Sequence, residues 1–520
     1  MTAHLAALGD WVAGLRIADV PAATLQAARY QILNMIAAAH GARQAVPIAR
    51  AVADFAGPGR ATVLVTGAKL GPADAALANC ACSMAEDFDD IVWMGHTCHS
   101  AVFAPLAVAE HEGRPSEELL LAVVAANEIG GRLGASCFLG PLNGQMWTFI
   151  HLVGAAAGTA KLLGLDAART THALAISLAQ PNFALQPGFM APTSKLLSAG
   201  TPTATGIQAA YFARAGMTGA ADILEDRRGF WRRFSFLALP GMLGGLGSLW
   251  VTETLTVKSY PGCHFFQTAG AAVDAILART GPLDGRVAAV RVETTKLGME
   301  VTRFARGYAP DDGPVTAVNS NFDLATTVAI HLHAGRLGSA ELDPAWLAAA
   351  TPALRALVAR TRVEHDPALT ARVLEGSRSV AAGRNALASL GPRDLVRLIA
   401  KYRDEYRSSL LTPREFAGWL KLAAGRVARR ASAHRQDAPS GAIPLYFPNR
   451  VTVELTDGRR ETERVDLPPG SFAAPTCGDV VAKKVLHETA GRLDGKRLLD
   501  GALALPATPL AELVSFARTP

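Results

Sequence analysis

Apolar residues recur at helical spacing through most of the first 245 positions of the chain. Near the N-terminus, Leu5, Leu8, Val12 and Leu15 fall on one face of a helix predicted over residues 5–15. Further helices are predicted at about 21–41, 72–86, 101–109, 116–129 and 154–163. These segments have broad apolar faces and many Ala and Gly positions that allow close approach. The pattern therefore predicts a helical bundle.

The spacing changes after a glycine-rich joint at residues 241–247. Alternating apolar and polar residues predict strands over 251–258 and 287–295. Further along, 451–455 and 461–467 flank an Asp-Gly dipeptide that is typical of a β-hairpin turn. Helices are predicted between these strands, at about 265–279 and 322–334. Helices and strands in this order indicate an α+β domain.

The two switches in periodicity predict how the domains are organised. The predicted fold class is mainly α with an α+β lid. Residues 1–250 form the first part of an all-helical bundle domain, and residues 251–469 form the smaller α+β domain. Residues 470–520 return to helix and complete the helical domain, which is then built from both chain ends. A length of 520 residues supports two domains, because single cores rarely grow beyond about 300 residues.

Residues 391–436 resemble a basic helical insertion in the second domain. Two amphipathic helices are expected there, the second opened by a capping box at Thr412–Glu415. Eleven Lys or Arg against four Asp or Glu give the segment a charge of +7, which leaves −1 for the rest of a chain of net +6. A basic surface can attract nucleic acid. Because no recognition motif accompanies the charge, we interpret the segment as a solvated hairpin outside the catalytic cleft and expect no nucleic-acid partner.

Composition narrows the class of protein. Half of the residues are hydrophobic and 18% are charged, which fits a well-packed globular enzyme and not a disordered chain. No apolar run approaches the 18 or so residues of a membrane span, and the N-terminus lacks the features of a secretory signal. The six cysteines are sparse and unpatterned, as expected for reduced thiols. These features predict a cytoplasmic protein without a membrane partner.

The segment MAEDFDDIVWMGHTCHS, which begins at position 84, is the first candidate for chemistry. It places three carboxylates, Asp87, Asp89 and Asp90, shortly before His96 and His99. An Ala-rich helical pattern runs into the segment and another apolar stretch runs out of it. Ionisable groups between two apolar helices are costly to bury unless they are paired or used. The segment is therefore expected to lie in a functional site.

Metal binding is a competing use of the same segment. His96 and His99, with Cys98 between them, are residue types that bind first-row metals. A second cluster of such residues is missing from the sequence, so we do not expect a metal.

Two later stretches carry further candidates. Lys195 is the single charged residue between Ala184 and Ala213, and a lysine among apolar neighbours can anchor an anion or act in proton transfer. A lysine whose stem covers the surface is the structural alternative. Lys258 opens the motif KSYPGCHFFQ, which leaves a predicted strand and enters a helix. Polar groups at the start of a helix lie where backbone N–H groups favour an anion.

These motifs, in this order, resemble the MmgE/PrpD family, which includes 2-methylcitrate dehydratase, cis-aconitate decarboxylase and an iminodisuccinate epimerase. The resemblance rests on DFDD followed by His99-Ser100, MAPTSKLLSAG around Lys195, KSYPGCHFFQ, and FDLATTVAIHLHAGRLG from Phe322. It covers nearly the whole chain apart from the insertion. The resemblance implies a helical domain with an α+β lid, a cleft between the two, a homodimer, and no cofactor.

The resemblance also implies a set of site residues. The residues expected to be catalytic are His99, Asp87, Lys195 and His264. The residues expected to bind substrate are Lys258, Gln267, Asp90, Ile91, Tyr260 and Ser198. Four positions depart from the family pattern: Ile91 replaces Thr, Gln267 and Ser198 replace His, and Thr326 replaces Tyr. Because groups that would hold a tricarboxylate are missing, we expect a less highly charged substrate.

Chemical reasoning assigns a role to each catalytic residue. Imidazole has an unperturbed pKa of about 6.5, close to working pH, so His99 is predicted to be the general base. Asp87 is expected to orient this imidazole. Lys195, with Lys258, is expected to bind a substrate carboxylate or the enolate-like charge left after proton removal. His264 is expected to return the proton.

Together these residues predict a cofactor-independent lyase or isomerase. Such an enzyme removes a proton next to a carboxylate or carbonyl of a small organic acid. Dehydration or decarboxylation is the first expectation and epimerisation the second, since all three reactions pass through a carbanion-like species. A non-catalytic small-molecule-binding relative is the alternative from another class. A metal-dependent enzyme that uses His96 and His99 is less favoured.

Overall fold

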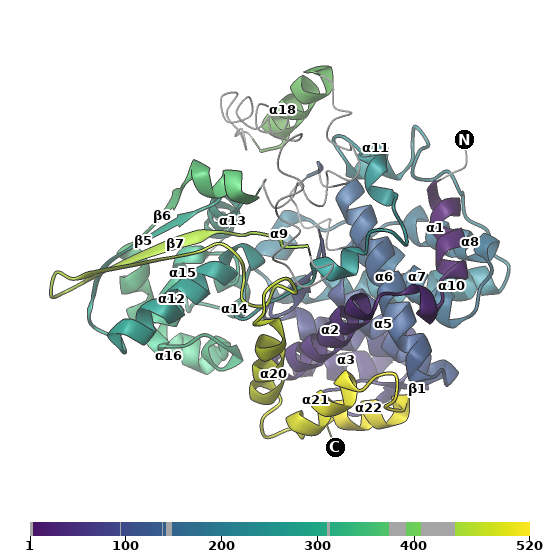
Figure 1. Cartoon of the computed structure of the whole chain (residues 1–520), viewed down its shortest axis with the longest axis horizontal. Coiled ribbons are helices and arrows are strands. Elements are labelled where there is room, and N and C mark those ends of the chain that lie inside the picture. Colours follow the sequence, from purple (N-terminus) through teal and green to yellow (C-terminus); the bar gives the residue numbers. More distant parts are fainter. Residues whose placement is uncertain are drawn as a thin grey trace.

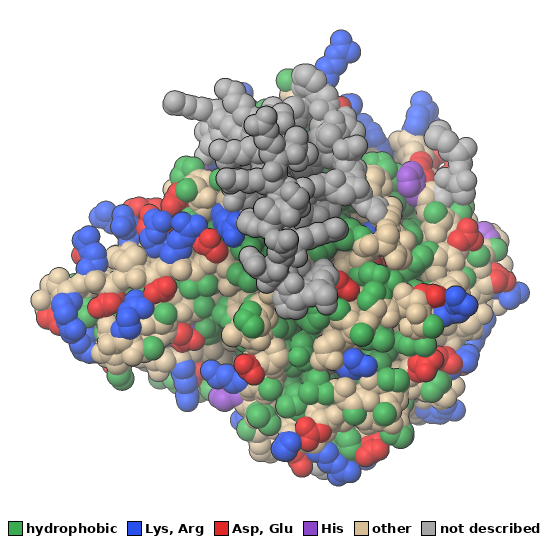
Figure 2. All heavy atoms as spheres, viewed as in Figure 1, with side chains coloured by type: hydrophobic (Ala, Val, Ile, Leu, Met, Phe, Trp, Pro, Cys, Tyr) green, Lys and Arg blue, Asp and Glu red, His purple; other side chains and the backbone are tan. Residues whose placement is uncertain are grey.

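The computed structural model describes residues 4–93, 95–137, 139–141, 148–308, 313–373, 392–406 and 443–519. The described part is mainly helical, with one four-stranded sheet and two two-stranded ones. A helical body fills one side of the view in Figure 1, and the four-stranded sheet with its covering helices projects from the other. On this face charged side chains gather over the sheet and the outer rim, whereas apolar side chains dominate the middle (Figure 2).

The helical body contains a helix at each of the predicted positions. Its main helices are α1 (His4–Gly14), α2 (Ala22–Gly41), α3 (Val46–Phe55), α4 (Pro72–Met84), α5 (Cys98–Glu112), α6 (Ser116–Ser136), α7 (Phe149–Leu162), α8 (Ala167–Ala179) and α10 (Leu197–Arg214). Of these, α3, α8 and α10 are additional to the predicted helices. Small residues let these helices approach closely. A Cβ at Gly206 of α10 would lie 2.3 Å from the carbonyl oxygen of Leu152 in α7, so only glycine fits at this crossing.

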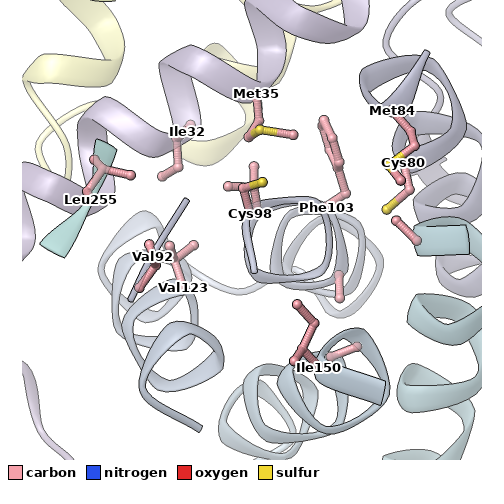
Figure 3. Packing of buried hydrophobic residues seen from close by; sticks show 14 of the residues in the cluster. Ile32, Met35, Cys80, Met84, Val92, Cys98, Phe103, Val123, Ile150 and Leu255 are labelled. Atoms are coloured by element: carbon pink, nitrogen blue, oxygen red, sulfur yellow. The ribbon is translucent and has the colours of Figure 1, made fainter. Parts of the chain in front are cut away.

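The core of this body lies directly beneath the candidate segment. Figure 3 shows Ile32 and Met35 of α2 packed with Cys98 and Phe103 of α5 and with Val123 of α6. All five side chains are at most 1% exposed. The segment that carries the carboxylates and histidines is therefore anchored in the buried core of the helical body.

The four-stranded sheet has the order β6-β5-β7-β8. Its strands are β5 (Val287–Thr294), β6 (Thr361–His365), β7 (Asn449–Leu455) and β8 (Arg460–Val465). The predicted hairpin is confirmed: β7 and β8 pair antiparallel, and Gly458 in the turn has a φ of +88°. The parallel pairing of β5 with β6 was not predicted. The helices of this part include α12 (Gln267–Thr280), α13 (Lys296–Gly307), α15 (Leu324–Ala334) and α16 (Pro344–Ala359).

The remaining described elements are short. They are β1 (Pro58–Thr62), β2 (Lys69–Leu70), β3 (Asp90–Ile91), β4 (Thr256–Val257), α9 (Gln186–Met190), α11 (Phe230–Phe234), α14 (Ala317–Ser320), and the 3₁₀ turns at Ile17–Asp19, Arg43–Ala45, Thr193–Leu196, Pro240–Leu243, Val251–Thr254, His264–Phe266 and Ser339–Leu342.

The strand predicted over 251–258 is wrong for its first half. Residues Val251–Thr254 form a 3₁₀ turn, and only Thr256–Val257 pair as β4. The buried carboxylate of Glu128 accepts hydrogen bonds from the backbone N–H groups of Val251 (3.1 Å) and Thr252 (2.9 Å). These donors are thereby satisfied without a neighbouring strand.

The C-terminal helices return to the helical body. They are α20 (Cys477–Glu488), α21 (Gly495–Leu503) and α22 (Leu510–Ala517). Arg29 of α2 donates to the carbonyl of Leu505 (2.7 Å), and the backbone N–H of Thr519 donates to the carbonyl of Leu64 (2.8 Å). The tail therefore packs on the first helices of the chain, while the boundaries drawn at 250 and 470 stay predictions.

Two further expectations concern single segments. The first helix of the basic insertion is present as α18 (Pro392–Tyr406), and the second helix of the expected hairpin lies outside the described residues. Among the described helices, α6 is long and apolar enough by length and composition to cross a membrane, although Glu128 and Arg132 interrupt its apolar residues. That stretch of α6 is entirely buried inside the protein, as in the core helix of a globular domain.

Candidate active site

The DFDD segment is held in place by a segment that follows it by about 170 positions. The backbone N–H of Lys258 donates to the carbonyl of Asp89 (3.1 Å), and that of Gly262 donates to the carbonyl of Glu86 (3.1 Å). The Lys258 ammonium donates to the carbonyl of Asp87 (2.7 Å). Asp87 has a φ of +48°, a conformation that non-glycine residues rarely adopt and that often marks functional sites.

Asp87 and Lys195 form a buried ion pair. Asn321 donates to the same carboxylate oxygen, Oδ2 of Asp87, at 2.9 Å. The Lys195 ammonium lies 4.5 Å from the ring centroid of Phe322, a favourable cation–π distance. Burial lowers the pKa of Lys195 below its ordinary value, although the carboxylate of Asp87 opposes the shift. The structure thus brings together two of the predicted catalytic residues and adds Asn321, which the sequence did not indicate.

Asp89 is the centre of a second set of contacts. Its carboxylate pairs with the Lys258 ammonium, lies 2.7 Å from Nδ1 of His96, and lies 3.3 Å from Nε2 of His99. Burial alone would raise the pKa of Asp89, but Lys258 and His96 outweigh it and hold the pKa well below the ordinary value. The same contacts raise the pKa of Lys258 despite its burial. Asp89 and Lys258 are therefore a charged pair at neutral pH.

The carboxylate beside His99 is therefore Asp89, whereas the sequence analysis placed Asp87 there. Asp87 is instead engaged by Lys195 and Asn321. The other nitrogen of His99, Nδ1, lies 2.8 Å from Oγ of Ser83 in α4. Asp87 and Asp89 nevertheless belong to one cluster, because Lys258 contacts both residues.

Three further histidines line the cluster in their neutral form. Burial lowers the pKa of His96 to about 4, against the opposing effect of Asp89. Burial also lowers the pKa of His264, whose ring lies 5.5 Å from that of His96. The third is His151 of α7, with a ring 5.6 Å from that of His99 and a pKa also lowered by burial. His151 was not among the residues predicted from the sequence. Its position as the lone histidine in the apolar stretch FIHLVGAAAGTA could have indicated it.

The predicted substrate-binding residues are distributed differently. The side-chain amide of Gln267 forms hydrogen bonds to the backbone. Its Oε1 accepts from the N–H groups of Ser259 (2.8 Å) and Tyr260 (3.1 Å), and its Nε2 donates to the carbonyl of Tyr260 (2.8 Å). The hydroxyl of Tyr260 donates to Asp274 (2.5 Å). Both residues therefore shape the loop that follows Lys258. Ile91 is buried and pairs with Thr256 in the β3–β4 ladder. Ser198 is half-buried near the start of α10.

Asp90 faces away from this cluster because neighbouring residues of an extended chain point to opposite sides. It accepts hydrogen bonds from Gln31 (3.0 Å) and Asn34 (2.8 Å) of α2. Asn34 in turn accepts from the ammonium of Lys484 in α20 (2.6 Å), which also contacts the carbonyl of Phe88. Burial raises the pKa of Asp90 to about 7 and lowers that of Lys484 to about 7. These contacts identify Asp90 as a support of the loop.

The raised pKa of Asp90 predicts a pH dependence of stability. The unfolded chain ionises this carboxyl near 3.8, whereas the folded protein keeps its proton to about pH 7. Between these two pH values the folded state therefore binds one more proton than the unfolded state. The contribution of Asp90 to the free energy of unfolding falls as the pH rises from about 4 to about 7. Asp90→Asn should remove up to about 1.4 kcal/mol per pH unit from that slope.

Urea denaturation at several pH values measures this change. Asp500→Asn is the control, because Asp500 pairs on the surface with Lys496 and should leave the slope unchanged. An unaltered slope in Asp90→Asn would contradict a protonated Asp90 in the folded protein.

The competing metal site has a donor set of its own. Ligand atoms of Asp89, Cys98 and His99 lie within 4.8 Å of one another. Burial raises the pKa of Cys98 well above its ordinary value, so the thiol keeps its proton, and Lys258 already neutralises Asp89. A cation here would have to displace that proton and compete with Lys258. The donor set therefore fits a metal poorly.

Comparison with known proteins finds the family that the motifs resemble. Residues 6–238 match a family model described as the MmgE/PrpD N-terminal domain. Cis-aconitate decarboxylase of Aspergillus terreus is 27% identical over 348 residues, which cover 62% of this chain and 70% of the fungal protein. The cis-aconitate decarboxylase-like protein oryM of Aspergillus oryzae is 26% identical over 377 residues, 65% of this chain and 75% of that protein. Human cis-aconitate decarboxylase is 28% identical over 222 residues, 39% of this chain and 45% of its own length. Residues 6–238 therefore form an MmgE/PrpD N-terminal domain, and the chain is similar to the cis-aconitate decarboxylases.

Proposed function

We propose that this protein is a lyase that acts on a small organic acid. It removes water after abstracting a proton next to a carboxylate, or it removes carbon dioxide. The observation that carries the proposal is the convergence of Asp87–Lys195 and Asp89–Lys258 with His99 in one buried cluster. Distant similarity to a carboxy-lyase supports the same class of reaction. No organic cofactor enters the proposed steps.

Each group has a role in the proposed reaction. His99 accepts the substrate proton, and the charged pair formed by Asp89 and Lys258 stabilises the imidazolium and the enolate-like charge that result. Lys195 binds a substrate carboxylate. His264, a neutral imidazole whose ring lies 5.5 Å from that of His96, relays a proton. In a dehydration the proton goes to the departing hydroxyl group, which leaves as water. In a decarboxylation it goes to the carbanion left when the bond to carbon dioxide breaks. Because these groups are buried, the charges interact more strongly than they would in water.

The charges of the cluster also support a preference for a weakly charged substrate. Lys195 and Lys258 are each paired with an aspartate, so the two lysines offer little surplus positive charge. The uncharged surroundings include Phe322 and Ile91, both at most 5% exposed. We therefore propose a mono- or dicarboxylate substrate in preference to a tricarboxylate.

Two other functions remain as alternatives with distinct outcomes. Epimerisation would use the same proton removal and return the proton to the opposite face. A binding relative would hold the acid without exchanging its α-proton. The expected homodimer and cytoplasmic location stay predictions.

Proton exchange with solvent tests the proposal before the overall reaction is known. The protein is incubated with hydroxy-, amino- and unsaturated mono- and dicarboxylates in deuterated water, and each recovered acid and product is analysed by mass spectrometry. Deuterium at the carbon next to a carboxylate, in substrate or product, is the expected result. Tight binding of an acid without exchange or turnover would favour the binding relative and contradict the proposal.

A further inference from the structure

Two histidines of the cluster contact serines of neighbouring helices in the same way. Nδ1 of His99 lies 2.8 Å from Oγ of Ser83 in α4, and Nδ1 of His151 lies 2.9 Å from Oγ of Ser100 in α5. All four side chains are fully buried. The contacts connect α4, α5 and α7 at the point where the two imidazole rings meet edge to face, with their centroids 5.6 Å apart.

Each serine also forms a hydrogen bond within its own helix. The Ser83 hydroxyl donates to the carbonyl of Cys80, and the Ser100 hydroxyl donates to the carbonyl of Thr97, both at 3.0 Å. A hydroxyl has one hydrogen to donate and two lone pairs to offer. When each hydrogen is directed to its carbonyl, the serine oxygen offers a lone pair to the histidine. In that arrangement the hydrogen of each imidazole is on Nδ1.

The surroundings of His151 support this assignment independently. Its Nε2 is buried and has no hydrogen bond partner among the residues that the structure describes. A hydrogen on Nε2 would be a buried donor without an acceptor, an arrangement that is rare in folded proteins. With the hydrogen on Nδ1, Nε2 of the neutral ring instead offers a lone pair to the cluster.

The surroundings of His99 lead to a related result. With Nδ1–H donated to Ser83, Nε2 becomes the atom that gains or loses the proton. That atom lies 3.3 Å from Oδ2 of Asp89. As the ring stands, Nε2 forms no hydrogen bond among the described residues. When His99 takes up a proton, Ser83 accepts its Nδ1–H, and the Asp89 carboxylate lies next to its Nε2–H.

We propose that Ser83 and Ser100 are positioning residues that hold His99 and His151 as Nδ1–H tautomers, with Nε2 turned toward the reacting groups. The inference rests on the proposed function in treating these histidines as parts of a proton-transfer site. The tautomers themselves are independent of that function. Neither serine touches the substrate in this scheme. Each serine acts only through the imidazole whose Nδ1–H it accepts as a hydrogen bond.

Nuclear magnetic resonance of protein labelled with ¹⁵N-histidine reads the tautomers directly. Two-bond couplings between ring nitrogens and carbon-bound protons distinguish Nδ1–H from Nε2–H. The signals are assigned by their loss in His99→Gln and in His151→Gln. Nδ1–H is expected for His151 at neutral pH and for His99 whenever it is neutral. Nε2–H in the wild-type protein at either position would overturn the proposal for that pair.

Substitution of the serines provides the functional arm. Ser83→Ala and Ser100→Ala should each lower the rate of α-proton exchange by about 10-fold or more while KM changes little, because a free imidazole distributes between two tautomers and orientations. Threonine at either position keeps the hydroxyl and should restore part of the rate, together with the wild-type couplings. A rate unaffected by alanine would contradict the positioning role.

Ser177→Ala is the matched control. Ser177 is a buried helical serine whose hydroxyl donates to the carbonyl of Leu174 at 2.8 Å, and it forms no hydrogen bond to a histidine within the described part of the chain. It should change neither the exchange rate nor the couplings of His99 and His151. If no acid exchanges deuterium in the wild-type protein, the proposed function fails, and the couplings alone decide the inference about the serines.

Discussion

His99→Gln is expected to lower turnover by at least about 100-fold, the lower range for loss of an acid–base group. Glutamine approximates the volume of histidine but cannot exchange a proton near neutral pH. The Asp89–Lys258 pair should persist, because it does not depend on His99. Binding of the substrate should therefore change less than turnover. Steady-state kinetics on any acid that exchanges deuterium, together with the exchange rate itself, measure the effect.

The control for this variant is His40→Gln. His40 of α2 is also a fully buried histidine, but it contacts the carbonyl of Ala517 (2.8 Å) and not the cluster. It should alter stability without a comparable loss of turnover per folded molecule. Near-normal turnover in His99→Gln, with turnover abolished in His264→Gln, would mean that the two histidines have been assigned each other's roles.

Lys195→Met is expected to destabilise the protein by about 3–5 kcal/mol and to weaken substrate binding. The substitution leaves Asp87 as a buried carboxylate whose remaining partners are Asn321 and the nearby Lys258. An uncompensated buried charge costs far more than the methylene groups of methionine recover. Urea denaturation gives the change in unfolding free energy, and calorimetry or substrate protection gives the change in affinity.

The double variant Asp87→Asn/Lys195→Met separates the two contributions. Because it removes both charges, its loss of stability should be smaller than the sum of the two single losses. Activity should not recover in the double variant, since the proposed anion-binding ammonium is still absent. Additive losses of stability would show that Asp87 and Lys195 do not interact in solution and would contradict the ion pair.

The local patterns of the sequence determined most of the elements. The helices α1, α2, α12 and α15 and the hairpin β7–β8 carry their own periodicity or turn residues, so short windows were sufficient. β6 was missed, because Thr361–His365 has only one buried residue and its partner β5 lies about 70 positions earlier. An edge strand of this kind is defined by its pairing and not by an apolar pattern.

The sequence also identified most of the charged residues of the candidate site, since carboxylates, histidines and lone lysines are conspicuous in apolar surroundings. It did not determine which groups pair. Asp87, Asp89 and Asp90 are the same residue type, yet their partners differ. Asp87 pairs with Lys195 and Asp89 with Lys258. Asp90 is connected to Lys484 through Asn34. Alternation along the extended loop and its pairing with β4 decide these partners, and both depend on backbone hydrogen bonds across about 170 positions.

Only the tertiary structure could show the contribution of the polar residues around the histidines. Ser83, Ser100 and Asn321 are common residue types whose roles arise from contacts made across helix packing, and no local pattern distinguishes them from other serines and asparagines. Their effect is directional, because a hydrogen bond fixes one atom of a ring or one oxygen of a carboxylate. The sequence by itself therefore determined the kind of chemistry available, whereas packing of α4, α5 and α7 decided which atoms of the histidines face the charged cluster.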